Sequence, residues 1–366
     1  MIYFDNAATT KPCKEAVGAA VACMDRCYGN PSSLHKMGIE SEKVIDSAKK
    51  TILSRLNKEG EIYFTSGATE SNNLAIFGTA KALKRRGNRI VTTAIEHPSV
   101  SEPMKRLEEE GFEVVYLRPC EHDDFEDALI KAVTEKTILL SLMAVNNETG
   151  FIIDSKRVYN SVKKRFPSCV VHLDGVQGFC KVPLFGDTIS LSAHKIHGIK
   201  GVGALYKAKG IRLLPNVYGG GQQGGIRSGT EPVDLICAFE AAVKAFPQNI
   251  TKFSELRHTL IQHLEQLEGI ILNSKNSTDH VDNIVNFSVQ GIRSEIMLHF
   301  LEERGIFVSS GSACSRGKVS PVLSALGVSD KNADSAVRVS FSLNNTGEEI
   351  DQLALALAEG IKRFRR

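Results

Sequence analysis

The sequence predicts an α/β fold, in which a mostly parallel sheet forms a large part of the chain and a smaller α+β part follows it. Three observations support this prediction. Short apolar stretches alternate with helix-like stretches over residues 61–141. These apolar stretches are nearly continuous, which is typical of strands buried on both faces of a sheet. After about residue 250 the pattern of helices and strands changes, so we expect a second, smaller unit there.

The elements of the larger part can be placed from residue spacing. Residues 37–56 carry apolar side chains at helical intervals. The predicted strands are 61–65, 89–93, 113–116, 137–141 and 170–174, and residues 203–206 form a further apolar stretch. The predicted helices between them are 69–84, 99–110 and one that precedes residue 137.

The smaller part mixes helices and strands differently. Helices are predicted over residues 253–267 and 294–303, and strands over 269–272, 283–289 and 337–341. A last helix has one apolar stripe that runs from Ile350 to Phe364.

Composition narrows the class of protein. The chain has 366 residues, a hydrophobic content of 42% and a net charge of +3, which argue for two domains and against nucleic acid or an anionic membrane as the main partner. The N-terminus lacks a secretory signal pattern, and no apolar run reaches the roughly 18 residues that span a bilayer. The eight cysteines are scattered without zinc-site spacing, so we expect free thiols in a reducing cytoplasm.

Lys195 is the residue that most narrows the function. It closes the run 190–195, while Asp174 ends the predicted strand 170–174. A lysine and an aspartate at two strand ends suit pyridoxal phosphate, because the lysine forms a Schiff base with the aldehyde and the aspartate keeps the pyridine nitrogen protonated. The alternative is an ordinary solvated lysine.

Two segments could hold the cofactor's phosphate. Residues 65–73 follow a strand and open a helix, where Ala68 and Thr69 present backbone N–H groups and a hydroxyl; a plain helix cap is the alternative. Ser192 and His194, beside the lysine, could add donors. A glycine-rich run, 219–230, ends in the hydroxyl of Thr230, although it could also be a mobile loop.

Further polar side chains follow apolar strands. His97 could stack on a cofactor ring, although a lone histidine is more often structural. Asn147 belongs to a run of amide and carboxyl side chains that must pair with each other or with a ligand. Arg338 lies on an apolar strand and needs an anionic partner, and its planar fork matches a carboxylate.

Cys314 is surrounded by small residues, so a thiol there can be exposed and mobile. Arg316 and Lys318 could favour its thiolate form. The alternative is an inert surface cysteine.

Together these segments resemble the cysteine desulfurases of the NifS/IscS type, which belong to the fold-type I pyridoxal phosphate enzymes and the class V aminotransferases. The resemblance runs nearly end to end and consists of nine features in the family's order. They are residues 3–10, 29–33 with His35, 65–71, 146–148, 172–177, 192–195, 227–230, 309–314 and Arg338.

The resemblance implies a fold and a domain division. A large domain, 12–250, would hold the cofactor on a mostly parallel seven-stranded sheet. A small domain, formed by 1–11 and 251–366, would carry the loop with Cys314.

The resemblance also implies a role for each matching residue. Lys195 would bind the cofactor and move protons, Asp174 would pair with its ring nitrogen and Gln177 would reach its ring oxygen. His97 would stack on the ring and shuttle protons. The phosphate would be held by Ala68, Thr69, Ser192 and His194, and by Thr230 from the neighbouring subunit of a homodimer. Asn147 and Arg338 would hold the substrate carboxylate.

The implied activity is a sulfur transfer. L-Cysteine would be converted to L-alanine, a persulfide would remain on Cys314, and an iron–sulfur scaffold or a tRNA-thiolating enzyme would accept the sulfur. Two alternatives remain: a selenocysteine lyase or cysteine sulfinate desulfinase, and a degenerate member that acts in assembly without catalysis.

The sequence departs from the family pattern in places. Gly175 stands where alanine is common, Cys180 stands where glycine is common, and the stretch after Cys314 is slightly short. The last departure leaves the reach of the loop, and so the acceptor, open.

Overall fold

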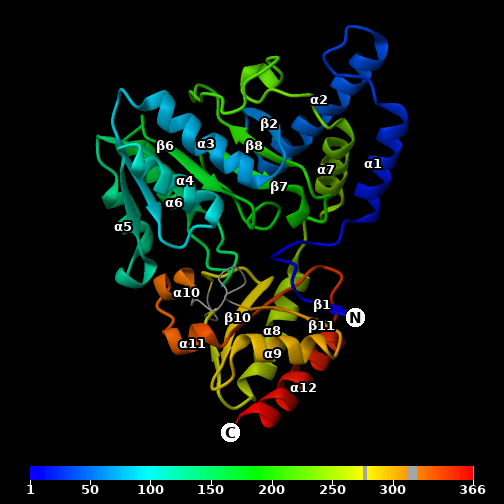
Figure 1. Cartoon of the computed structure of the whole chain (residues 1–366), viewed down its shortest axis with the longest axis vertical. Coiled ribbons are helices and arrows are strands. Elements are labelled where there is room, and N and C mark those ends of the chain that lie inside the picture. Colours follow the sequence, from blue (N-terminus) through cyan, green and yellow to red (C-terminus); the bar gives the residue numbers. More distant parts are fainter. Residues whose placement is uncertain (275–277, 311–319, 366) are drawn as a thin grey trace.

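The computed structural model describes residues 1–274, 278–310 and 320–365 of the chain. Figure 1 shows two parts, a larger one built around a seven-stranded sheet and a smaller one that contains both chain ends. None of the helices within the described ranges has the length and apolar character needed to cross a membrane.

The seven-stranded sheet has the strand order β2-β8-β7-β6-β5-β3-β4. Strands β7, β6, β5, β3 and β4 run parallel, whereas β8 is antiparallel to both of its neighbours. The predicted α/β class with a mostly parallel sheet is therefore confirmed. The strands are β2 (Glu61–Thr65), β3 (Arg89–Thr93), β4 (Glu113–Leu117), β5 (Thr137–Met143), β6 (Val170–Asp174), β7 (Thr188–Ser192) and β8 (Gly203–Lys207).

Helices cover both faces of this sheet. Ile90 shares a core with α3 (Ala68–Leu83) and α4 (Pro98–Glu109), whereas its neighbour Val91 belongs to the core on the other face. This split follows from the strand geometry, because successive side chains point to opposite faces. From the larger part, the second core receives side chains of α1 (Lys14–Arg26), α2 (Lys36–Leu56), α5 (Phe125–Ala132), α6 (Ser155–Arg165) and α7 (Val233–Ala245).

The smaller part contains an antiparallel sheet of order β12-β13-β10-β9. Helices α8 and α9 pack against the long C-terminal helix α12. The strands are β9 (Ile270–Leu272), β10 (Ile284–Val289), β12 (Ser309–Ser310) and β13 (Ala336–Ser340). The helices are α8 (Thr251–Glu265), α9 (Ser294–Glu302), α10 (Pro321–Ala325), α11 (Asp330–Asp334) and α12 (Gly347–Phe364).

The N-terminal segment joins the smaller part. Strand β1 (Ile2–Tyr3) pairs with β11 (Ile306–Phe307), and Asp5 forms a bridge to Ser340 of β13. These pairings support our proposal that residues 1–11 belong with residues 251–366, separate from residues 12–250.

Candidate active site

The predicted site residues gather at one edge of the seven-stranded sheet. Asp174 is the last residue of β6, and Lys195 ends the short turn η2 (Ala193–Lys195) that follows β7. His97 comes shortly after β3, and Asn147 comes shortly after β5. Because parallel strands end at the same edge of a sheet, the fold brings these four residues to one place.

The start of α3 lies at the same edge. Ser192, the last residue of β7, pairs with Gly203 of β8. A Cβ atom on Gly203 would lie 2.7 Å from the Cα of Gly67, the N-cap of α3, so glycine permits this close approach. Ala68 and Thr69, two of the predicted phosphate-binding residues, follow Gly67 directly and therefore lie near the end of β7.

Unused hydrogen-bonding groups in this corner fit a phosphate. The Oγ of Ser192 is buried and has no hydrogen-bond partner in the described part of the chain. Gly67 provides no side-chain cap, so the N–H groups of the first turn of α3 lack that partner. A phosphate satisfies groups of both kinds. Burial, together with Lys195, lowers the pKa of His194 to about 4, so this histidine is a neutral hydrogen-bonding group.

Lys195 is held by backbone carbonyl groups of the N-terminal segment. Its Nζ donates to the carbonyl oxygens of Ala7, at 2.6 Å, and Ala8, at 2.8 Å. The Nε2 of Gln177 donates to the same carbonyl of Ala7 at 2.9 Å. Burial lowers the pKa of Lys195 to about 8, and the nearby charge of Arg338 acts in the same direction. More of this amine is therefore uncharged near neutral pH than of an ordinary lysine, and the uncharged form is the one that attacks an aldehyde.

Asp174 and His97 are joined through two side chains that were given no role from the sequence. Asn72 donates from Nδ2 to Oδ2 of Asp174 at 2.9 Å and to Oγ of Ser99 at 2.8 Å. The same Oγ lies 2.9 Å from Nδ1 of His97. Burial lowers the pKa of His97, and the charge of Lys195 also lowers it, whereas that of Asp174 raises it. The signal that could have identified Asn72 is an amide on the buried side of an apolar helix, where it must find partners.

Arg338 already has an anionic partner. Its Nη2 donates to Oδ1 of Asp5 at 2.6 Å, and its Nη1 donates to the carbonyl oxygen of Asn147 at 2.9 Å. The Nε of Arg338 is buried and has no partner among the described residues. The predicted pair of Asn147 and Arg338 is thus brought into contact, and the guanidinium keeps an unused donor.

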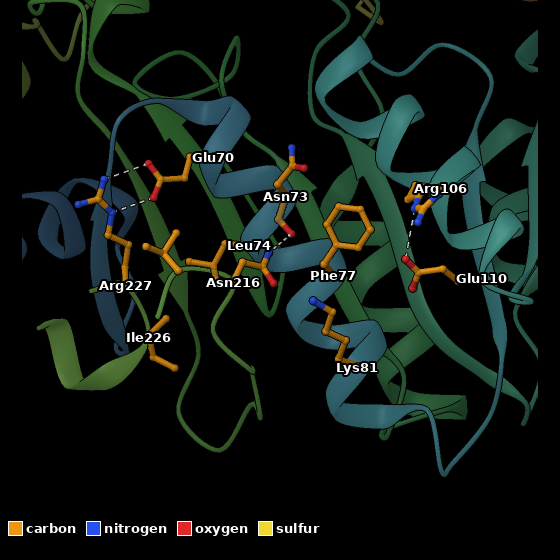
Figure 2. Close-up of a pocket in the computed structure, with 11 residues that line it drawn as sticks. Glu70, Asn73, Leu74, Phe77, Lys81, Arg106, Glu110, Asn216, Ile226 and Arg227 are labelled. Atoms are coloured by element: carbon orange, nitrogen blue, oxygen red, sulfur yellow. Dashed lines mark hydrogen bonds and ion pairs between the residues drawn. The ribbon is translucent and has the colours of Figure 1, made fainter. Parts of the chain in front are cut away.

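The glycine-rich segment is tied to the larger part by side chains. Gln223 accepts from the backbone N–H of Phe64 and donates to its carbonyl, and Arg227 pairs with Glu70 of α3. Figure 2 shows this ion pair beside a surface pocket of about 390 Å³. Thr230, which ends the segment, is exposed in this single chain.

Cys314 lies outside the described residues, but both flanks of its segment are anchored at the site. Ser309 of β12 pairs with Arg338 of β13. On the other side, Ser320 donates from Oγ to Oε2 of Glu148 at 2.7 Å and caps α10. The chain therefore leaves and re-enters the described structure beside Arg338 and Glu148.

A cavity of about 450 Å³ lies beside two of the predicted site residues. It lies at the starts of α3 and α4, and its lining includes Thr69, His97 and Ser99. A ligand in this cavity would contact Thr69 and His97, whereas Lys195 and Asp174 do not line it.

The structure shows the local setting of two departures from the family pattern. Cys180 has a φ of 66°, in the left-handed region that favours glycine. A methyl group on Gly175 would lie 2.7 Å from Cγ2 of Ile189, so alanine would not fit beside this isoleucine without movement. Neither position removes a predicted catalytic group.

Comparisons with known proteins identify the family of the chain. A family model described as aminotransferase class-V matches residues 2–353. A curated "NifS/IcsS protein homolog" from Lactobacillus delbrueckii subsp. bulgaricus is 37% identical over 378 residues, which cover 100% of this chain and 98% of the relative. A curated "Cysteine desulfurase IscS" from Dictyoglomus turgidum is 38% identical over 379 residues, which cover 100% of this chain and 95% of the relative.

Solved structures give the same result. A structure described as a NifS-like protein has a TM-score of 0.89 and 34% identity, and the match covers 99% of each chain. A structure described as "SspA in complex with cysteine" has a TM-score of 0.81 and 31% identity, over 93% of this chain and 99% of that one.

Proposed function

This chain belongs to the aminotransferase class-V family, and from that membership we propose that it is a cysteine desulfurase, which mobilises sulfur from L-cysteine. The observation that carries the proposal is the meeting of Lys195, Asp174 and His97 at one sheet edge, next to a corner of unused hydrogen-bonding groups. Full-length relatives named as cysteine desulfurases support the choice of substrate.

The residues present fit pyridoxal phosphate. Lys195 would hold the aldehyde carbon, Asp174 the ring nitrogen and Gln177 the ring oxygen, while His97 would stack on the ring. The phosphate-binding residues would be Ala68, Thr69, Ser192 and His194. When bound, pyridoxal phosphate supplies an electron sink for the bonds that break at the substrate α-carbon.

Lys195 would move the proton of the substrate. Because its pKa is lowered to about 8, its Nζ can take a proton from the α-carbon and return it near neutral pH. The carbonyl groups of Ala7 and Ala8 accept hydrogen bonds from this nitrogen and can hold it in place while it is unattached.

Arg338 and Asn147 would hold the substrate carboxylate. The buried guanidinium is positioned by Asp5 and by the backbone of Asn147, and a carboxylate would provide the partner that its Nε lacks.

Cys314 would accept the sulfur. Its thiolate would attack the substrate sulfur, so that a sulfur–sulfur bond forms as the carbon–sulfur bond breaks. The carbon keeps the electron pair and takes a proton, L-alanine leaves, and a persulfide remains. An iron–sulfur scaffold or a tRNA-thiolating enzyme would then receive the sulfur. We place this reaction in the cytoplasm, because eight scattered cysteines suit a reducing compartment.

The test is to add L-cysteine to the purified protein and to measure L-alanine together with a persulfide at Cys314 by mass spectrometry. A Lys195→Ala variant should lose both the yellow colour of bound cofactor and the activity. A protein that stays colourless with pyridoxal phosphate would instead support the non-catalytic alternative. Unchanged turnover of L-cysteine by a Cys314→Ser variant would contradict the persulfide step, as expected for a lyase acting on selenocysteine or cysteine sulfinate.

We further propose a homodimer in which Thr230 reaches the phosphate in the neighbouring subunit. Its exposure in the single chain, at the end of a segment fixed by the ion pair of Arg227 with Glu70, supports this role. Mixing Lys195→Ala and Thr230→Ala subunits tests it. If Thr230 acts across the interface, the hybrid dimer has one intact site, and activity returns on mixing.

A further inference from the structure

A chain of buried side chains lies behind the candidate active site. It runs from Thr188 on β7, through His172 on β6 and Asn72 on α3, to Asp174 at the end of β6. The distances are 2.9 Å from Thr188 Oγ1 to His172 Nδ1, 3.0 Å from His172 Nε2 to Asn72 Oδ1 and 2.9 Å from Asn72 Nδ2 to Asp174 Oδ2. The first three side chains are fully buried and Asp174 is 7% exposed, so water cannot replace these bonds.

The direction of each hydrogen bond follows from the carboxylate. An ionised carboxylate can only accept, so the side of Asn72 that faces Asp174 must be its NH₂ group. The Oδ1 of Asn72 then faces His172 and accepts from Nε2–H. The Nδ1 of His172 is left without a proton, and it accepts from the hydroxyl of Thr188.

The charge state of His172 agrees with this direction. Burial lowers its pKa to about 3, so the ring is neutral at physiological pH and offers one donor and one acceptor. The charged and titratable groups that face Asp174 come from other elements. They are Glu96 and His97, which follow β3, and Lys195, which follows β7.

Ser99 sets the proton on His97, and Asn72 helps to orient the hydroxyl of Ser99. Because Asn72 donates to Oγ of Ser99, the hydroxyl hydrogen of Ser99 is free to donate to Nδ1 of His97 at 2.9 Å. The backbone N–H of Ser99 donates to the same Nδ1 at 3.1 Å. The proton of the neutral ring is therefore on Nε2.

We propose that Thr188, His172 and Asn72 are positioning residues, which form a one-directional chain of hydrogen bonds, here called the relay, that aims Asp174 at the cofactor's ring nitrogen. The proposal rests on the proposed function in one respect, namely that the ring facing Asp174 is that of pyridoxal phosphate. The hydrogen bonds of the relay join residues of this chain and do not depend on the cofactor. Its three elements are fixed relative to one another, since His172 pairs in register with Thr188 and α3 packs on β6 and β7. The backbone N–H of Val176 donates to the other oxygen of Asp174 at 3.1 Å, which leaves little freedom for the carboxylate to rotate.

The first test measures the protonation state and the tautomer of His172. In the full-length apo-protein, nitrogen NMR of labelled histidines should show His172 neutral and protonated on Nε2 throughout the range in which free histidine titrates. A charged His172, or one that carries its proton on Nδ1, would overturn the relay whether or not the protein binds pyridoxal phosphate.

Matched threonine variants give the second test. Thr188→Val removes the donor to His172, whereas Thr79→Val removes a hydroxyl that is equally buried on α3 and has no partner among the described residues. Thr188→Val should shift the His172 nitrogen signals and weaken cofactor binding to the apo-protein several-fold, while Thr79→Val should do neither. Equal effects of the two variants on both readouts would refute the relay.

An Asn72→Ala variant should weaken cofactor binding about tenfold, as expected for the loss of a hydrogen bond to a charged group. Cooperative thermal unfolding checks that each variant is folded. If the parent protein shows the expected histidine tautomers and still binds no pyridoxal phosphate, the proposed function fails while the relay stands.

Discussion

The guanidinium of Arg338 is bound to the carboxylate of Asp5 through a 2.6 Å hydrogen bond from Nη2 to Oδ1. This ion pair is mostly buried, with the two side chains 8% and 24% exposed. It joins β13 to the segment after β1, and the same segment supplies the carbonyl groups that hold Lys195. The N-terminal residues therefore position two predicted groups. Arg338 would bind the substrate carboxylate, and Lys195 would move the proton of the substrate α-carbon.

Replacing Arg338 by lysine should weaken substrate binding. Lysine keeps the charge but loses the planar fork, and a lost hydrogen bond between charged groups costs about 1.5–3 kcal/mol. We expect the KM for L-cysteine to rise by roughly tenfold to a hundredfold, with a smaller change in kcat. Arg304→Lys is a matched control. Arg304 also forms an ion pair, at 2.6 Å with Glu359 of α12, but it is not one of the predicted site residues. Equal KM values for the two variants would contradict the role of Arg338.

The amine of Lys195 should react with an acylating reagent at unusually low pH. Its pKa is lowered to about 8 by burial and by the charges of Arg338 and Lys181, against the opposing charges of Asp174 and Asp5. In the apo-protein, we expect the acylation rate of Lys195, measured at each pH by residue-resolved mass spectrometry, to reach half of its maximum near pH 8. Lys131 is the reference, since its hydrogen bond with Asp127 raises its pKa above the ordinary value. A common pH dependence for the two lysines would contradict the prediction.

Glu96 should make stability fall as the pH rises. Burial raises the pKa of its carboxyl from 4.5 to about 8, so between these values the native protein keeps a proton that the unfolded chain releases. Rising pH therefore favours unfolding in this window, by a few kcal/mol at most.

A Glu96→Gln variant should lack this pH dependence, because its amide keeps an oxygen for Thr93 and the backbone of Met143 and cannot ionise. Urea unfolding at several pH values measures the difference between parent and variant. Glu303→Gln, at an exposed carboxyl, is the control and should follow the parent.

The protein should be more stable with glycine at position 180 than with alanine. A side chain in the left-handed region costs about 1–2 kcal/mol, and the φ of Cys180 is 66°. We therefore expect Cys180→Gly to exceed Cys180→Ala in free energy of unfolding by about 1 kcal/mol. The same pair of variants at Cys27, where φ is −119°, should show the opposite order. If the glycine and alanine variants had the same order of stability at both positions, the backbone angle φ would not be the cause of the difference.

The bond between Ser320 and Glu148 should matter for sulfur transfer rather than for cofactor binding. Ser320 follows the segment of Cys314 directly, and its Oγ both donates to Glu148 and caps α10. Loss of this anchor in Ser320→Ala should slow persulfide formation about tenfold, since small misplacements of reacting groups have large effects. Cofactor affinity should stay unchanged. Ser329→Ala, at the N-cap of α11 where the side chain makes no cap bond, should match the parent in single-turnover assays.

Local patterns in the sequence were sufficient for the fold class and for most of the larger elements. Apolar stretches such as 137–141 and 170–174 became buried strands, because nearly continuous hydrophobic runs suit a parallel sheet covered on both faces. The two-residue strands β11 and β12 were not predicted, since so short a stretch carries no periodic signal.

The sequence also determined which chemical groups meet at the sheet edge, because Asp174 and Lys195 follow parallel strands whose ends must lie together. Only the tertiary structure decided what each group binds. Arg338 and Asp5 are separated by 333 positions, and Asn72 and Asp174 by 102. Hydrophobic periodicity is set by the immediate neighbours of a residue, whereas these hydrogen bonds arise when packing buries polar groups from distant segments and forces them to satisfy each other.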